Sequence, residues 1–335
     1  MKVPIIKSSE LKEITSFLIE KKIIFHPTIS PNGTPDFSSY NDKRYILILD
    51  RNLLVRILRL ANTGTLKEKF SLKLINSLLA WAEFNGITAT AGMALMEYSY
   101  HNQGDKESNI ENNVFLEIFK KTNLYDWINL AMGKKNTIPS INSNNDNKND
   151  FFVKSDHFKM HYLEMLKMTQ LYFDDNVSIE NKFKLLLVWI YDNILICKYT
   201  IFYSLLVFGN KSKIFKNQIY DYQKLIKICS NQAWDLTYLS IWSTLYFNES
   251  ESKDIFLLAT MDKELKDLFV ITHKDNLEIF IDTFGSKLGN NIIENINEIL
   301  VKREKPEIDS KVLDKLILNE EKKLRHLTQP KRNAD

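Results

Sequence analysis

The chain has 335 residues, of which 44% are hydrophobic and 26% charged, and its formal net charge is +3. The apolar content is enough for a sizeable core and excludes a chain that is disordered as a whole. Only 9 glycines and 7 prolines argue against an all-β fold with many tight turns, and the small net charge does not by itself indicate a nucleic-acid partner.

The N-terminal third alternates helical patterns with short apolar runs. A helix pattern starts at Ser8, and a polar loop follows over residues 26–40. The apolar run at residues 45–49 does not alternate with polar residues, which indicates a strand buried on both faces. The elements predicted next are helices at 53–62 and 66–85, a short strand at 87–90 and a helix that opens at Thr90 or Ala91.

The remainder is mainly helical in pattern. Residues 136–150 are rich in asparagine and predict a surface loop or linker. Beyond them, the predicted elements are long helices within 151–228, a helix at 231–247, a second buried strand at 255–259, a candidate short strand at 269–272 and helices at 277–284 and 292–302.

Four acidic residues stand at abrupt boundaries of this pattern. Asp50 closes the first buried strand and Asp262 follows the second, while Glu97 and Asp235 lie in predicted helices. A carboxylate at the carboxyl end of a buried strand lies where open α/β sheets bind their ligands. If the four carboxylates converge, they suit a hard divalent cation.

The segments that carry these acids resemble a PIN domain. Residues 47–54 are similar to the strand, Asp and helix that open that family, and residues 90–97 to its second element, in which a helix carries Glu. Residues 231–236 resemble the third acidic element, and residues 256–265 resemble the late strand followed by Thr, one residue and Asp. In this chain 137 residues separate Glu97 from Asp235, more than is usual for the family, so the resemblance requires a helical insertion.

The resemblance implies an α/β fold in which a small parallel sheet is flanked by helices, in a chain that is predominantly helical overall. It divides the chain into an N-terminal helix and loop at 1–42, a first part of the core at 43–100, a helical insertion at 101–227, a second part of the core at 228–302 and a charged C-terminal helix and tail at 303–335.

The resemblance also implies a metal-dependent endoribonuclease, with a toxin or phage-defence role as an analogy. Mg²⁺ or Mn²⁺ is the implied cofactor, because such an ion activates water and neutralises the leaving oxygen. The implied catalytic and metal-binding residues are Asp50, Glu97, Asp235 and Asp262. The residues implied to orient ligands or water are Asn52 and Thr260, and those implied to meet phosphates are Arg51, Lys263, Lys43 and Arg44.

Two other classes of function remain open. An Asp after a strand is often only a helix N-cap, so the chain is alternatively an inactive PIN-like module that binds RNA or a protein. In the second alternative it is a helical interaction protein in which the four acids never meet. His157 and His161 are spaced as zinc ligands on a helix, but the intervening Glu of the metalloprotease motif is absent, and two ordinary helix histidines are the favoured interpretation.

The remaining features predict the surroundings of the protein. Cys197 and Cys229 lie in largely apolar stretches, which favours buried free thiols and a reducing cytoplasm. No secretory signal follows the N-terminus, and the most apolar stretch, residues 190–208, is interrupted by charges, so no membrane association is expected. Single-stranded nucleic acid, most often RNA, is the expected substrate, and the C-terminal helix is a candidate for contact with a protein partner or a second copy.

Overall fold

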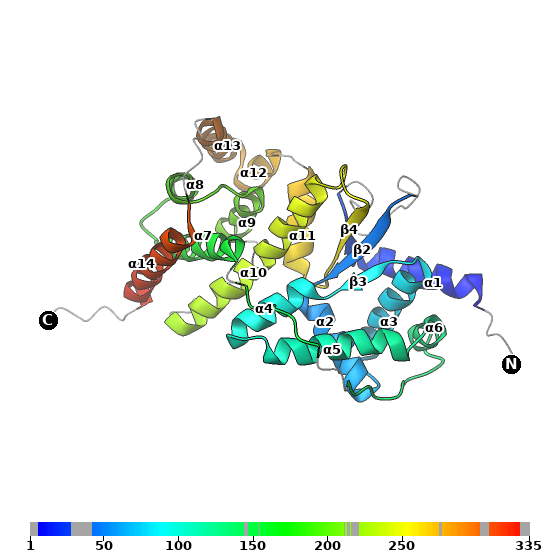
Figure 1. The fold of residues 1–335 in the computed structure, drawn as a ribbon. Coiled ribbons are helices and arrows are strands. Elements are labelled where there is room, and N and C mark those ends of the chain that lie inside the picture. Colours follow the sequence, from blue (N-terminus) through cyan, green and yellow to red (C-terminus); the bar gives the residue numbers. More distant parts are fainter. Residues whose placement is uncertain are drawn as a thin grey trace, which may run out of the picture. The chain divides into compact units, whose positions relative to one another are not determined.

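The computed structural model describes residues 6–27, 42–143, 147–153, 155–210, 212, 215, 221–274, 277–301 and 308–328. Within these residues the chain forms fourteen helices and one four-stranded sheet, so the protein is an α/β protein in which helices predominate (Figure 1). The predicted loop at 26–40 lies outside the described residues from position 28 onward, as do the last residues of the predicted tail, 329–335.

The chain divides into two compact units. The first comprises residues 1–154 and 242–266, and the second comprises residues 155–241 and 267–335. The predicted insertion at 101–227 is therefore shared between them, because its part up to residue 154 belongs to the first unit. The predicted second part of the core, 228–302, is divided in the same way, since only residues 242–266 of it lie with the first unit.

The first unit holds the sheet. Its strands are β1 (Ile24–Phe25), β2 (Arg44–Leu49), β3 (Thr88–Thr90) and β4 (Asp254–Ala259). Its helices are α1 (Ser8–Lys21), α2 (Arg51–Thr63), α3 (Lys69–Phe84), α4 (Gly92–Asn102), α5 (Lys106–Lys121) and α6 (Leu124–Ala131). The end of α10 (Tyr222–Phe247) and the start of α11 (Lys263–Lys274) also belong to it.

The sheet is mixed and its order is β1-β4-β2-β3. Strand β2 pairs in parallel with β3 on one side and with β4 on the other, whereas β1 pairs antiparallel with β4. Three strands are thus parallel, as the buried apolar runs indicated, and β1 adds an antiparallel edge. Because Leu49 pairs with Ala259, the residues that follow β2 and β4 leave the sheet at the same edge.

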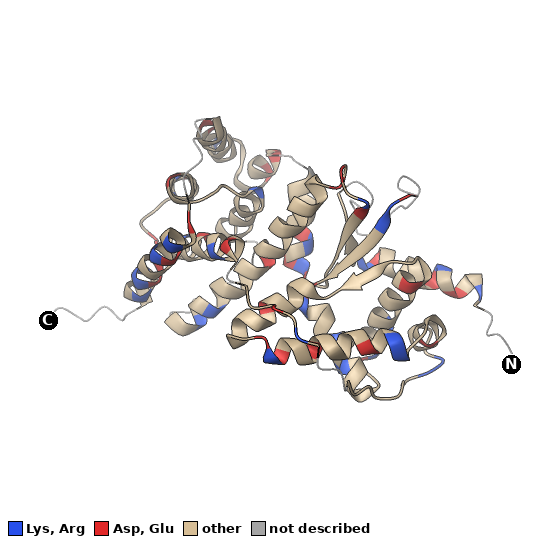
Figure 2. Ribbon diagram, viewed as in Figure 1, with Lys and Arg blue, Asp and Glu red and all other residues tan. Residues whose placement is uncertain are grey.

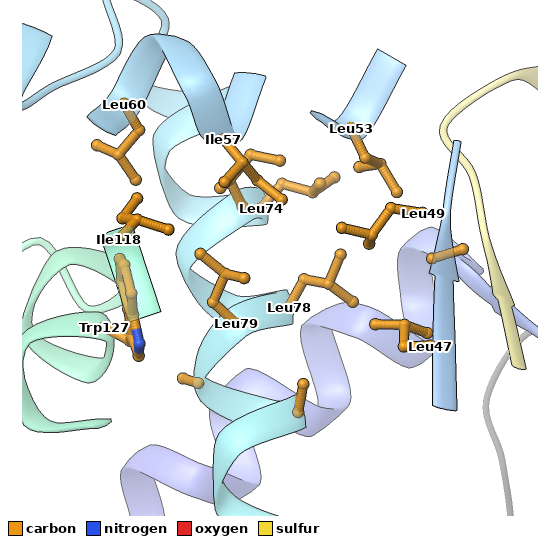
Figure 3. Close-up of a cluster of buried hydrophobic side chains, with 14 of the residues drawn as sticks. Leu47, Leu49, Leu53, Ile57, Leu60, Leu74, Leu78, Leu79, Ile118 and Trp127 are labelled. Carbon is orange, nitrogen blue, oxygen red and sulfur yellow. The ribbon is translucent and has the colours of Figure 1, made fainter. Parts of the chain in front are cut away.

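The core of the first unit fills the space between the sheet and its helices. Figure 3 shows Leu47 and Leu49 of β2 pointing toward Leu53 of α2 and Leu78 of α3. These four side chains are at most 1% exposed. The alternation of β2 places Ile48 on the opposite side of the strand, where it is also buried. Burial of both faces of β2 fixes its register and with it the position of the residue that follows it.

The second unit is entirely helical in its described residues. It contains most of α10 and α11 together with α7 (Asp156–Tyr172), α8 (Ile179–Asn193), α9 (Lys198–Phe208), α12 (Glu278–Phe284), α13 (Ser286–Val301) and α14 (Ser310–Thr328). The C-terminal helix α14 packs against α7, and Lys159 of α7 pairs with Asp314 at 2.7 Å. No described helix combines the length and the apolar character that a bilayer span requires.

One strand prediction is wrong. Residues 269–272 belong to α11 rather than to a strand. Its buried residues, Leu265, Leu268, Phe269 and Thr272, recur at steps of three and four, the period of a helix. The apolar run Phe269-Val270-Ile271 looked like a strand because β-branched and aromatic residues are enriched there, but tertiary packing of the helical face decided the structure.

Candidate functional site

Asp50 lies at the junction between β2 and α2. It is the N-cap of α2, and its Oδ1 accepts a hydrogen bond of 2.7 Å from the amide of Leu53. The hydroxyl of Thr260 donates to the other oxygen, Oδ2. The amide of Met261 also donates to this carboxylate, and Asp50 is only 4% exposed, so directed hydrogen bonds hold it inside the protein.

Asp262 is the third residue after β4 and directly precedes α11. Its Oδ1 accepts a hydrogen bond of 2.9 Å from the amide of Leu265, in the first turn of α11. Its own amide donates to Oγ1 of Thr260 at 3.0 Å. The hydroxyl of Thr260 therefore connects the two aspartates, because it donates to Asp50 and accepts from Asp262. Thr260 is 1% exposed and its amide donates to the carbonyl of Ile23, so its position is fixed.

The electrostatics of this aspartate pair favour a cation. Burial raises the pKa of Asp50 to about 6, against the lowering effect of its hydrogen bonds from Thr260 and Leu53. The negative charge of Asp262 raises the pKa further. A buried carboxylate next to a second carboxylate is costly to ionise, and a bound cation removes that cost.

Glu97 lies on α4, the helix that follows β3. This helix packs against β2 and α2, the two elements that carry Asp50. The side chain of Glu97 is 17% exposed and lies 4.0 Å from Nε2 of His101, one turn further along the helix. Within the described part of the chain, no group of three or more His, Cys, Asp or Glu side chains is arranged to bind a metal.

Asp235 belongs to the second unit. It lies on α10 next to Trp234, whose ring stacks on Phe158 of α7 with a centroid distance of 4.7 Å. The structure brings Asp50 and Asp262 together in the first unit and places Asp235 outside that unit.

The residues predicted to contact phosphate lie in three different settings. Arg51 forms a bidentate ion pair with Glu111 of α5, in which Nη2 lies 2.9 Å from Oε1, and its guanidinium lies 4.0 Å from the ring centre of Tyr98. These contacts hold α2, α4 and α5 together. Lys263 is exposed at the start of α11, directly after Asp262, and Asn52 is exposed in the first turn of α2.

Lys43 and Arg44 lie at the opposite end of β2 from Asp50. Arg44 is six positions before Asp50, which is about 20 Å along an extended strand. Arg44 pairs there with Asp254 at 2.7 Å, and the amine of Lys43 donates to the carbonyl of Glu249. Proximity to Asp50 in sequence therefore does not place these two cations at the same edge of the sheet.

The aspartate pair supplies carboxylate oxygens, the donor type that a hard cation prefers. Oδ1 of Asp50 accepts from the amide of Leu53 and Oδ2 from the hydroxyl of Thr260, and the amide of Met261 is a further donor to this carboxylate. Oδ2 of Asp262 has no partner among the described residues. Magnesium sites commonly combine one or two carboxylates with water and substrate phosphates, which is the donor set that Asp50 and Asp262 supply.

Two features of the site were not anticipated from the sequence. The first is Glu111, whose pairing with Arg51 depends on the packing of α5 against α2 and has no signal in sequence spacing. The second is that α2 carries further arginines at Arg56 and Arg59, a signal present in the composition of the helix. Comparison with models of known protein families, with curated proteins and with solved structures found no match to this chain.

Proposed function

We propose that the first unit is the catalytic part of a metal-dependent endoribonuclease with a PIN-like core. The observation that supports this most is the pair Asp50 and Asp262, which follow adjacent parallel strands and share the hydroxyl of Thr260. Two aspartates that were only helix caps would have no need of a common buried hydroxyl between them. The order of strand, Asp and helix along the chain supports the same function, as do the pairing of β2 with β3 and β4 and the position of α4 after β3.

In this proposal Asp50 and Asp262 hold Mg²⁺ or Mn²⁺ from one side. The bound ion supplies an activated water and charge neutralisation at the leaving oxygen. The hydroxyl of Thr260 donates a hydrogen bond to Oδ2 of Asp50. This bond keeps the carboxylate oriented and favours its ionised form. The proposal assigns Glu97 as a further ligand and single-stranded RNA as the substrate.

The test is cleavage of a labelled single-stranded RNA by the purified full-length chain in Mg²⁺ or Mn²⁺. We expect Asp50→Asn to lower the cleavage rate by at least about a hundredfold, because the metal loses its central carboxylate. Glu97→Gln tests the other assignment in the same assay.

The matched control is Asp254→Asn. Asp254 begins the same strand that Asp262 follows, and its partner is Arg44 at the far end of the sheet. We expect its variant to cleave RNA at the wild-type rate. Equal rates for wild type and Asp50→Asn would refute the proposal, and metal-independent RNA binding without cleavage would favour an inactive binding module instead.

A further inference from the structure

Helix α2 begins at the proposed catalytic aspartate and is unusually basic. Its 13 residues include three arginines and no Asp or Glu (Figure 2). Arg51 pairs with Glu111 and lies over the ring of Tyr98. Arg56 and Arg59 lie further along the helix and take no part in these contacts. A helix with unbalanced positive charge that starts at a phosphodiesterase site is a candidate for contact with the substrate backbone.

The two arginines share one face of the helix with Asn52. At about 100° per residue, Asn52, Arg56 and Arg59 fall within roughly 60° of one another around the axis. A hydrogen bond of 2.9 Å from Nη1 of Arg56 to the carbonyl of Asn52 lies along this stripe. Asn52 and Arg59 are exposed and Arg56 is partly exposed. The opposite face buries residues that include Leu53, Leu54, Ile57 and Leu60 in the core.

The charges of this stripe are not compensated within the described residues. Neither Arg56 nor Arg59 has a carboxylate partner there, in contrast to Arg51 with Glu111 and to Lys120 with Glu117 at 2.8 Å. Structural arginines at buried or interface positions are usually paired, as Arg51 is. Arg56 donates one N–H to the carbonyl of Asn52, and the remaining N–H groups of the two guanidiniums are available to an external anion.

The spacing of the stripe suits a polyanion. From Asp50 to Arg59 the helix rises about 13.5 Å, at 1.5 Å per residue. A nucleic-acid strand carries one charge per roughly 3.4 Å in the stacked form, so about four phosphates fit along this length. Guanidinium groups bind phosphate oxygens with two parallel hydrogen bonds, and the amide of Asn52 adds a neutral donor at the end nearest Asp50.

We propose that the Asn52, Arg56 and Arg59 stripe of α2 binds the backbone phosphates of the single strand that is cleaved at Asp50 and Asp262. This inference rests on the proposed nuclease function and specifies how its substrate is held. The contacts involve phosphates alone, so the stripe binds single-stranded RNA and single-stranded DNA of equal length with similar affinity. The site at Asp50 and Asp262, and not the stripe, then determines that RNA is the strand that is cleaved.

The experiment measures binding in the absence of metal. A fluorescein-labelled twelve-nucleotide RNA is titrated with full-length protein in EDTA, over a series of salt concentrations, so that cleavage cannot interfere. We expect Arg56→Ala/Arg59→Ala to raise the Kd by about tenfold or more at low salt and to reduce the slope of log K against log salt by about 1.4, since each single-strand phosphate contact contributes about 0.7. A twelve-nucleotide DNA strand is expected to behave in the same way.

The matched control is Lys120→Ala/Lys121→Ala. It removes the same two positive charges from α5, where both lysines already pair with Glu117. We expect this variant to bind like the wild type. An unchanged Kd and salt slope in the arginine variant, an equal loss in the lysine variant, or no measurable binding by the wild type would each overturn the inference.

The outcome of the binding experiment can be distinguished from the outcome of the nuclease test. If RNA binding depends on the two arginines but no metal-dependent cleavage is found, the inference about phosphate binding stands and the nuclease proposal is rejected. If cleavage depends on Asp50 but not on Arg56 or Arg59, the nuclease proposal stands and the inference about phosphate binding is rejected. Because the side chains of Arg56 and Arg59 face solvent, their replacement is expected to leave the thermal unfolding midpoint within about 2 °C of the wild type.

Discussion

At the scale of single residues, the sequence identified Asp50 and Asp262 because each follows a buried apolar run. The structure places both at one edge of the sheet and adds what a sequence cannot give, the direction of each hydrogen bond. Thr260 was predicted to orient ligands or water, and its hydroxyl contacts both aspartates. Lys43 and Arg44 were predicted to contact phosphate, but β2 separates them from Asp50 and places them at its opposite end.

The raised pKa of Asp50 predicts how the metal-free protein responds to pH. Its folded-state pKa of about 6 exceeds the ordinary value of 3.8, so the folded state binds this proton more tightly than the unfolded chain does. The stability from this group is fully present below pH 4 and is lost as the pH rises through 6, by about 3 kcal/mol at most. In EDTA, Asp50→Asn should therefore flatten this pH dependence and raise the urea midpoint at pH 7.

Urea titrations of both proteins between pH 4.5 and 7.5 measure this effect. Asp254→Asn serves as the control, because Asp254 is paired with Arg44 at the other end of the sheet. A lower urea midpoint for Asp50→Asn at pH 7, or an unchanged pH slope, would mean that burial does not penalise the charge of Asp50.

Thr260 gives a second prediction at this scale. Thr260→Val keeps the shape of the side chain but removes the donor to Asp50 and the acceptor for the amide of Asp262. Buried polar groups left without partners cost about 1–3 kcal/mol, so we expect a loss of free energy of unfolding in that range. Thr260→Ser retains the hydroxyl and should lose less. Chemical denaturation compares the two, and a larger loss for Thr260→Ser than for Thr260→Val would show that packing of the methyl group, and not the hydroxyl, decides stability at this position.

At the scale of elements, the predicted strands at 45–49 and 255–259 are confirmed by β2 and β4. Short buried parallel strands are recognisable because their apolar residues do not alternate. Strand β1 escaped detection, because two residues carry no periodicity and its pairing with β4 is a long-range contact. The helical identity of 269–272 was missed because its buried positions are set by packing over the whole of α11 rather than by local composition.

The end of α2 offers a test of how the elements of the first unit are joined. Gly64 ends α2 with φ +73, and a Cβ there would lie 2.2 Å from the carbonyl oxygen of Ile138. Gly86 has φ +65 but open space around it. We expect Gly86→Ala to cost about 1–2 kcal/mol from the left-handed conformation alone, and Gly64→Ala to cost clearly more because backbone must also move. Equal thermal shifts in the two variants would exclude a close packing of the 138 segment against α2.

At the scale of the whole molecule, the sequence patterns predicted a largely helical α/β chain, and the structure confirms this. The division of the chain into two units could not be predicted from these patterns. Helices α5 and α6 read as part of an insertion because they follow the second acidic element, yet they complete the core around α2 and α3. Helical patterns show which face is buried but not against which neighbour, so the sequence alone does not assign α5 and α6 to a unit.

The proposed PIN-like nuclease rests on a pair of aspartates that follow two parallel strands, so its central claim is that this pair binds a divalent ion. The most direct measurement is Mn²⁺ binding to the full-length protein by electron paramagnetic resonance, for the wild type, Asp50→Asn/Asp262→Asn and Asp254→Asn. We predict that the wild type and Asp254→Asn bind Mn²⁺ and that the double variant loses this binding. Equal Mn²⁺ binding by the wild type and the double variant, or none by either, would contradict the account.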